Sequence, residues 1–547
     1  MKRLLIHWKS LVGILMIPTL IIGFLVGTSI QHNIAKIHAA GDAQQPGSYQ
    51  DYVELMAKQH KAPFFSQQLA TETNMQEFAK KIQRAPVKKP VDRNVSTNIK
   101  VNQDHNAWPK AGVSAAINPV NGKNLVVTSS DFRQEFNHPY YHVTTDGGQT
   151  WSDDAIADGI DATTFAPYNF QSNLGVAFDR NGHTILSNVS GNTFSDASTG
   201  YFNFDTEIEV VQGNVNGTSA SIVPTAIDYA SCHGVGALTA DNCAGAVDKP
   251  LVTVDTGVSS LTKNTIYVYY TYFCHAAHAC QHGDITIPAY SSAILESQAE
   301  GVDLPFSAPK LVSGTQTQAQ FANMTIDSSG TARIFFDDFT SYPTIKMYES
   351  SLVADSWEVN QTPVATFQYA GLNNPNWSFR DQGTVAPGCS IFKDTAYCAF
   401  SATQAGTYKN SGTPSVYLAA VNTATGTANV YRVNNDAIDN GKDHIFPWAS
   451  TDTHGNVYVG WYDNRNDPFN VKLEYFVGKS TNGGQSFLNQ QAVSTTSFNP
   501  CVGTPNCVFF GDYNQLVTGP DDVTHTFWSD TRDSASMQIY TQALKWN

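Results

Sequence analysis

Charge is the scarcest property of this chain, and positive charge in particular. Asp, Glu, Lys and Arg make up only 14% of the 547 residues, and 32 Lys and Arg stand against 47 Asp and Glu, for a formal charge of −15. A chain this acidic repels phosphates, so the composition excludes a nucleic-acid-binding role. The same charge disfavours an anionic ligand unless arginine residues reverse the field locally.

Long apolar runs are lacking beyond the N-terminus. The exception is 11–30, which follows a basic start and is long enough to span a bilayer. The cleavage signal at 37–40 is weak, so residues 1–40 are predicted to be an uncleaved anchor, with a signal peptide as the alternative. Either alternative exports the rest of the chain. Residues 41–92 are predicted to be a polar linker and a helical stalk, which ends before the prolines at 86 and 90.

Cysteine is also scarce, and its eight copies fall into four close pairs. Such pairs predict four local disulfides and an oxidising, extracytoplasmic location. Metal binding is the alternative at 274–282, where two Cys and three His lie within nine residues. A structural zinc site would need a second ligand pair, and none is evident. The predicted disulfides join Cys232 to Cys243, Cys274 to Cys280, Cys389 to Cys398, and Cys501 to Cys507.

Gly, Ser, Thr, Asn and aromatic residues are abundant in 93–547, which indicates an all-β domain of short strands and polar loops. Seven comparable units recur at a spacing of roughly 60 to 80 residues. Each unit has a second β-prone run, and three of these runs end in Asp-x-Arg. The first strands are expected to begin near Val113, Leu174, Leu251, Ala322, Gly383, Phe446 and Asp512.

The segment 144–151, TTDGGQTW, resembles the Asp-box of sialidase-like β-propellers, whose pattern is S/T-x-D-x-G-x-T-W. The segment 480–487, STNGGQSF, resembles a decayed second copy. The resemblance implies four-stranded blades arranged radially and, in the enzymes of the family, hydrolysis of terminal sialic acid. It also implies that the box is structural and lies away from the active site. Its residues are Asp146, Gly148 and Trp151 in one copy, and Asn482, Gly484 and Phe487 in the other.

The last unit is short by one strand and ends at the C-terminus. A closed ring has no exposed strand edges, so the absent strand is expected from 95–102. This predicts a seven-bladed propeller, whereas the family's enzymes have six blades. Six blades remain the alternative if one unit is an insertion.

The residues just before each inner strand are expected to surround the mouth of a central channel, where a ligand site is usual in a concave surface. Capping of strand ends is the alternative role for each of them. A glycan or a glycoprotein is the expected ligand. The predicted ring comprises Trp108, Lys110, Asn173, Asp248, Lys249, Asn323, Arg380, Asp381, Asp443, His444, Asp512 and Tyr513.

The resemblance also implies a catalytic set: three arginines that grip the substrate carboxylate, a Tyr nucleophile with a Glu partner, and an Asp acid/base. Tyr513 lies where the nucleophile is expected, Asp512 is beside it, and Glu474 is the candidate partner. The family's F/Y-R-I-P motif is absent from the chain. The candidate arginines are Arg133, Arg380, Arg465 and Arg532.

Three of these arginines belong to the repeated Asp-x-Arg motif, as Asp131 with Arg133, Asp463 with Arg465, and Asp530 with Arg532. Repetition in several blades favours a structural ion pair over a substrate contact. The function therefore stays open between an exo-sialidase and a non-catalytic propeller that binds glycans or proteins. No cofactor is expected except calcium, for which 337–338 and 463–467 offer carboxylates without a fixed spacing.

Overall fold

The computed structural model describes residues 98–104, 108–133, 138–156, 170–195, 202–213, 224–235, 245–274, 278–289, 291–369, 374–377, 379, 385–405, 408–409, 412–502, 510–532 and 536–546. All regular elements in these ranges are β-strands. No helix long and apolar enough to cross a membrane occurs among them. The predicted anchor, linker and stalk lie outside the described residues.

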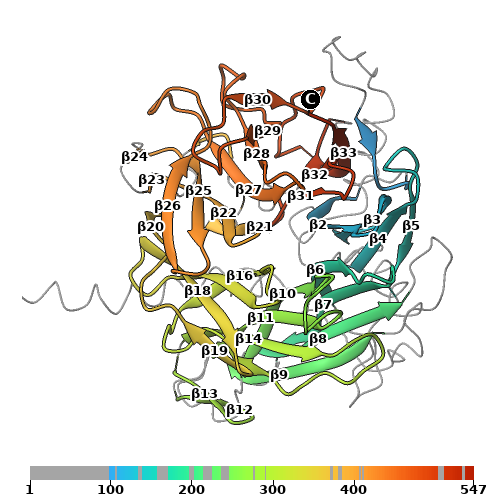
Figure 1. Ribbon diagram of the computed structural model, residues 1–547, viewed down its shortest axis with the longest axis vertical. Helices are drawn as coiled ribbons and strands as arrows, with labels where there is room; N and C mark the ends of the chain where they lie inside the picture. The colour runs from blue at the N-terminus through green and yellow to red at the C-terminus, as the bar shows by residue number, and fades with distance from the viewer. Residues whose placement is uncertain are drawn as a thin grey trace, which may run out of the picture.

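Seven sheets stand radially around a common axis, as Figure 1 shows. In chain order, the sheets form blades 1 to 7. Blade 1 contains β2 (Lys110–Asn118), β3 (Asn121–Asp131), β4 (His138–Thr144) and β5 (Ser152–Ala155). Blade 2 contains β6 (Phe170–Phe178), β7 (Thr184–Ser195), β8 (Phe202–Gly213) and β9 (Thr225–Val235). Blade 3 contains β10 (Ala246–Val254), β11 (Ile266–Cys274), β14 (Ser291–Ala299) and β15 (Lys310–Leu311), with a separate hairpin of β12 (Cys280–His282) and β13 (Ile285–Ile287).

The remaining blades follow the same order, with additions only in blade 4. Blade 4 contains β16 (Ala319–Ile326), β17 (Ala332–Asp338), β18 (Thr344–Val353) and β20 (Ala365–Gln368), extended by β19 (Ser356–Val359), β23 (Gln404–Ala405) and β24 (Tyr408–Lys409); blade 5 contains β21 (Gly388–Phe392), β22 (Thr395–Ala402), β25 (Ser415–Asn422) and β26 (Thr427–Arg432); blade 6 contains β27 (His444–Thr451), β28 (Val457–Asp463), β29 (Glu474–Ser480) and β30 (Asn489–Ala492); blade 7 contains β31 (Gln515–Thr518), β32 (Thr524–Asp530), β33 (Gln538–Leu544) and β1 (Ile99–Lys100).

The ring closes through its two chain ends. β1 pairs antiparallel with β33, so the first described strand completes the last blade. Each first strand lies against the first strand of the next blade, and β31 lies against β2. The predictions of seven blades and of a closing strand within 95–102 are both confirmed.

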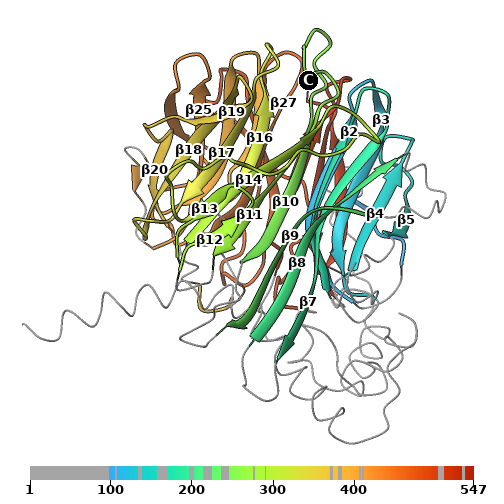
Figure 2. The same cartoon turned by 90° about the horizontal axis from the view of Figure 1, so that it is seen from below.

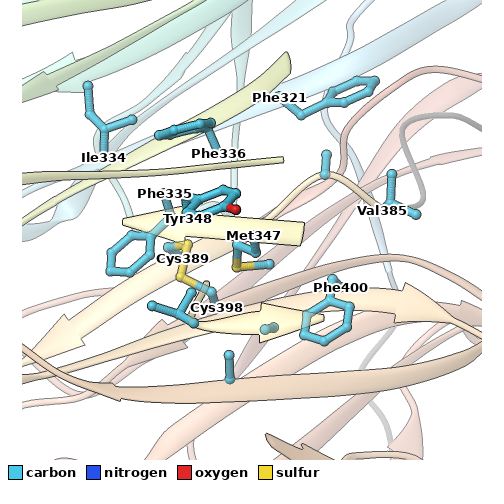
Figure 3. Packing of buried hydrophobic residues seen from close by; sticks show 14 of the residues in the cluster. Phe321, Ile334, Phe335, Phe336, Met347, Tyr348, Val385, Cys389, Cys398 and Phe400 are labelled. Atoms are coloured by element: carbon cyan, nitrogen blue, oxygen red, sulfur yellow. A yellow bond between two sulfur atoms is a disulfide. The ribbon is translucent and has the colours of Figure 1, made fainter. Parts of the chain in front are cut away.

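The second strands are buried on both faces because a blade is sandwiched between two neighbours. All seven residues of β28, VYVGWYD, are buried, as are all nine of β11. Their β-branched and aromatic residues suit such a position. Figure 3 shows one joint of this kind, where Phe335 and Met347 of blade 4 lie near the Cys389–Cys398 disulfide of blade 5.

Five of the first strands carry a β-bulge near their start. The first bulged residue has a left-handed backbone at Gly112, Lys249, Phe321 and Phe446, with φ between 52° and 63°. For Lys and Phe this conformation is strained, and such strain persists only where the surroundings fix it. We call the end of the ring at which the first strands begin the bulge end, and the opposite end the turn end. Figure 2 shows the strands running between these two ends.

Two predicted disulfides are confirmed, Cys274–Cys280 and Cys389–Cys398. Cys501 is also disulfide-bonded, but its predicted partner Cys507 lies outside the described residues. Cys243 lies outside them as well. The bond at 274–280 uses both cysteines of the segment that was the alternative metal site.

Candidate functional site

The Asp-x-Arg motif forms the same structure in three blades. In blade 7, the Arg532 backbone N–H donates to Asp530 Oδ1 at 2.7 Å, and its Nε and Nη2 donate to Oδ2 at 2.8 and 2.5 Å. Trp528 Nε1 donates to the same oxygen, and the guanidinium lies 4.2 Å from the centre of the Tyr540 ring. The two guanidinium bonds to Asp530 Oδ2 and the Tyr540 ring hold the guanidinium in place.

Blades 6 and 1 repeat this arrangement. Arg465 binds Asp463 through its backbone N–H and Nε, both at 2.7 Å, and lies 4.7 Å from the centre of the Phe476 ring. Arg133 binds Asp131 through the same two groups, both at 2.8 Å. A side chain that makes the same bonds in three blades has a structural role.

Each of these arginines also reaches the segment that follows the outermost strand of the preceding blade. Arg532 Nη1 donates to Thr495 Oγ1 at 3.1 Å, and Arg465 Nη1 donates to Asn435 Oδ1 at 2.9 Å. Arg133 Nη2 lies 3.3 Å from Asp104 Oδ1. The three guanidinium groups therefore lie in three separate networks, each of which fastens one blade to the next.

His444 and Lys110 occupy equivalent positions, opposite the motif aspartates of blades 6 and 1 in the strand register. His444 Nδ1 donates to the Pro414 carbonyl at 2.9 Å, and its Nε2 lies 3.1 Å from Asp436 Oδ2 and 3.5 Å from Asp463 Oδ2. Burial alone would lower the pKa of His444, but the two carboxylates outweigh it and raise the pKa above the ordinary value. The two carboxylates near Nε2 therefore favour the protonated form of His444.

Lys110 makes the corresponding contacts in blade 1. Its Nζ donates to Asp104 Oδ2 at 2.6 Å and to the Trp108 carbonyl at 2.8 Å. Although burial disfavours the charge of Asp104, Lys110 and Arg133 bring the pKa of that carboxyl down to about 2. Both predicted ring members, Lys110 and His444, are thus placed inside ion networks between blades.

Tyr513 lies at the bulge end of blade 7, where the nucleophile was expected. Its side chain is only 7% exposed and packs edge-on against the Trp448 ring, with ring centres 6.3 Å apart. Its carbonyl accepts a hydrogen bond from the Val113 N–H at 3.2 Å, which links blade 7 to blade 1. Asp512 beside it is buried. Glu474, the candidate partner, begins the third strand of blade 6 and accepts a hydrogen bond from Asn466 at 2.5 Å.

The other predicted ring members lie at several places. Lys249 is buried, binds Asp248 Oδ2 through its Nζ at 2.8 Å, and lies 5.5 and 5.8 Å from the centres of the Phe321 and Phe273 rings. Asn323 is buried in the first strand of blade 4. Outside the described residues lie Arg380, Asp381 and the side chain of Asn173.

The chain that connects blades 4 and 5 contacts blade 6 at the bulge end. Asn374 Nδ2 donates to Asp443 Oδ2 at 3.1 Å, and Trp377 Nε1 donates to the Val471 carbonyl at 3.1 Å, both in blade 6. The Phe379 ring stacks near Phe446 of blade 6 and Phe510, which precedes blade 7. This aromatic contact joins three blades beside the hub.

The loop 464–473 of blade 6 carries an exposed aromatic ring that the sequence analysis did not single out. The Phe469 side chain is 78% exposed, whereas its backbone is held in place. Asn376 Nδ2 donates to the Phe469 and Asn470 carbonyls, both at 3.2 Å, and Asp467 Oδ1 accepts from the Phe469 N–H at 3.3 Å. The Asp-Pro-Phe-Asn sequence, a turn signal with an apolar residue in it, is the feature that could have indicated this residue.

The two turns that resemble Asp-boxes lie at the turn end, opposite these residues. In 144–151, Asp146 Oδ1 accepts from the N–H groups of Gln149 and Thr150, and Gly148 N–H donates to Thr144 Oγ1. The indole of Trp151 donates to the Gly148 carbonyl and packs against Phe527 of blade 7. In 480–487 the corresponding bonds link Asn482 to Ser486 and Gly484 to Ser480, and the ring of Phe487 is buried.

The acidic segments considered for calcium differ in their contacts. Both carboxylate oxygens of the buried Asp337 have no hydrogen-bond partner among the described residues, whereas Asp338 Oδ1 accepts from the Thr340 N–H. Asp337 and Asp338 are consecutive in β17, so their side chains point to opposite faces of the blade. Asp463 binds Arg465, and Asp467 Oδ2 accepts from the N–H groups of Val471 and Lys472.

A third group with metal-ligating side chains lies at the turn end. Asp452, His454 and Asp522 place three potential ligand atoms within 4.8 Å of one another. The Asp452 carboxylate there closes a turn by accepting from the N–H groups of His454 and Asn456.

Comparison with known proteins gives only distant likenesses. No family model and no curated protein matches the chain. Among solved structures, a Fusarium graminearum α-L-arabinofuranosidase is 10% identical over 82% of this chain and 98% of its own, with a TM-score of 0.39. A Hadza microbial sialidase is 11% identical (75% and 73% covered, TM-score 0.38), and a Penicillium chrysogenum α-L-arabinanase is 9% identical (83% and 99% covered, TM-score 0.38). At TM-scores below 0.5, these likenesses carry no argument about function.

Proposed function

We propose that this protein is an extracytoplasmic propeller that binds glycans at its bulge end without the carboxylate grip of a sialidase. The observation that carries the proposal is the state of Arg133, Arg465 and Arg532, each held by the aspartate of its own blade. None of the three presents a free guanidinium fork to a sugar carboxylate. The net charge of −15 also favours a neutral ligand over an anionic one, and the disulfides support an oxidising location.

Phe469 is the side chain that we expect a sugar to contact. Its exposed ring offers a flat apolar face, and the Asn376 side-chain amide binds the Phe469 and Asn470 carbonyls beside it. Ligand sites combine such apolar faces with a few polar groups that fix orientation. Because the loop is held before any ligand arrives, binding requires little further ordering of the chain.

Glycan-array binding of the full chain tests this proposal. We expect Phe469→Ala to weaken binding by about tenfold or more, as for an aromatic anchor at an interface. Leu488→Ala is the matched control, since Leu488 is an equally exposed apolar residue of blade 6 near the turn end. Absence of binding to any glycan, or equal losses in the two variants, would contradict the proposal.

Hydrolysis of a terminal sialic acid is the second candidate, and the position of Tyr513 next to Asp512 favours it. Its carboxylate grip would have to come from residues outside those described, among them Arg380. Turnover of a sialoside that Tyr513→Phe abolishes would establish this candidate in place of the first.

A further inference from the structure

The joint between blades 1 and 2 is apolar toward the turn end and polar toward the bulge end. Its apolar part is a buried cluster that includes Val126 and Tyr141 of blade 1 and Leu186 and Val211 of blade 2. Side chains alternate along a strand, so the residues two positions from Val126, Leu186 and Val211 toward the bulge end lie on the same face as these three. Those residues are Thr128 in blade 1 and Asn188 and Glu209 in blade 2, and each of the three is polar and buried.

Two rows of polar side chains cross the polar part of blade 2. The strand register places Gln171, Ser190 and Glu207 side by side in one row, and Asn188 beside Glu209 in the next. Asn188 Nδ2 donates to Glu209 Oε2 at 2.6 Å, and the Ser190 hydroxyl donates to the same oxygen. A hydrogen bond also joins the Glu207 and Glu209 carboxyl groups.

Several buried oxygen and nitrogen atoms on this face have no hydrogen-bond partner among the described residues. They are both amide atoms of Gln171, which is 1% exposed, Oδ1 of Asn188, which is 0% exposed, and Oγ1 of Thr128. A buried polar atom without a partner costs about 1–3 kcal/mol, so this many at one joint need an explanation. The Gln171 side chain lies in the same row as Ser190 and Glu207, on the face of blade 2 that carries both carboxyl groups.

No positive charge is among the interactions that act on Glu209. These come from a hydroxyl, an amide and the second carboxyl group. Burial raises the pKa of Glu209, because the charged carboxylate is disfavoured away from water. A divalent cation beside Glu209 would supply a positive charge at this position.

We propose that this joint cluster, made of Thr128, Gln171, Asn188, Glu207 and Glu209, binds one Ca²⁺ ion and so locks blade 1 to blade 2. Ca²⁺ takes 6–8 oxygen ligands from carboxylates, amide carbonyls and hydroxyls, which are the groups that the cluster offers. Zinc fits poorly because the cluster has no His or Cys, and Mg²⁺ prefers to keep several waters. Two carboxylates match the charge of a divalent ion.

Calorimetric titration of the chelator-treated full chain with CaCl₂ tests the proposal. We expect one site, with a stoichiometry of about one Ca²⁺ ion per chain. Ca²⁺ should also raise the melting temperature by about 3 °C or more at a concentration 100-fold above Kd, and Mg²⁺ should do so less. Neither readout depends on glycan binding.

Substitutions of the two glutamates test whether they bind the ion. Glu209→Gln and Glu207→Gln should each weaken Ca²⁺ binding by about 100-fold or more while the apo protein still folds, because glutamine keeps the size of glutamate and one hydrogen-bond-accepting oxygen. Glu296→Gln is the matched control: Glu296 is also buried with its pKa raised to about 7, and it lies in blade 3. A wild-type chain that binds no Ca²⁺ overturns the proposal and leaves a hydrated acid pair. Binding that survives both substitutions overturns it too, because the ion then lies elsewhere.

Discussion

At the scale of single residues, position in the blade decides what a charged side chain can do. Arg465 looks like a substrate ligand in the sequence, yet the structure encloses it between Asp463, Asn435 and the Phe476 ring. The recurrence of Asp-x-Arg in three blades indicated this role, because a substrate contact is not expected to repeat from blade to blade. The contact with the preceding blade could not be read from the sequence, since it joins residues 30 positions apart.

His444 gives a residue-scale prediction about pH. Its pKa is raised in the folded state, so its contribution to stability is complete below the unfolded value near 6.5 and is lost as pH rises through the folded pKa. We expect the free energy of unfolding of the wild type to fall with rising pH in the neutral to alkaline range. His444→Lys, which copies Lys110 of blade 1, should flatten this dependence because lysine keeps its charge there.

Urea denaturation at a series of pH values from 6 to 9 measures the effect. His454→Lys is the control, since His454 is largely exposed at the turn end. If the free energy of unfolding changes equally with pH in the wild type and in His444→Lys, His444 does not carry the charge assigned to it.

At the scale of elements, sequence patterns identified strands well and long-range contacts poorly. The second strands were found because their β-branched and aromatic runs reflect burial on both faces, and β22 (Thr395–Ala402) coincides with the expected run. The inner-strand bulges were not expected, since a left-handed Phe321 or Phe446 contradicts local preference. The path of 374–379 toward blade 6 was also beyond prediction, because nothing local specifies a partner about 95 residues away.

The two turns that resemble Asp-boxes allow a prediction of how substitutions of Asp146 affect stability. Oδ1 of Asp146 and Oδ1 of Asn482 each accept a hydrogen bond from the backbone N–H four residues on. We therefore expect Asp146→Asn to change the free energy of unfolding by less than about 0.5 kcal/mol, and Asp146→Ala to cost about 1–2 kcal/mol, as for the loss of a capping side chain.

Thermal and chemical denaturation of the two variants measure the difference. Asp303→Ala, at an exposed position of blade 3, controls for the loss of a surface charge. Equal losses in Asp146→Asn and Asp146→Ala would show that the carboxylate charge, not the turn, sets the stability.

At the scale of the whole molecule, the ring depends on a short strand from the far end of the chain. β1 contributes only two residues to the ladder, so side chains near it add to the closure. Asn102 is fully buried, accepts from the Ile539 N–H at 2.9 Å, and donates to Gln538 Oε1 at 2.7 Å. These bonds join residues more than 430 positions apart.

Asn102→Ala should lower the free energy of unfolding by about 2–3 kcal/mol, because the Ile539 N–H and Gln538 Oε1 each lose the hydrogen bond to Asn102 in a buried site. Hydrogen exchange should become faster in β33 than in blade 4, which lies across the ring. Asn121→Ala, at an exposed hairpin residue of blade 1, is the control. Uniform acceleration in all blades would argue against a local closure.

The most direct test of the account is fluorogenic sialoside hydrolysis by the purified full chain, measured from acidic to mildly alkaline pH. Since Arg133, Arg465 and Arg532 are bound within their own blades, we predict no turnover above the buffer blank at any pH. Turnover that disappears in Tyr513→Phe would contradict the account and make the bulge end of this propeller a sialidase active site.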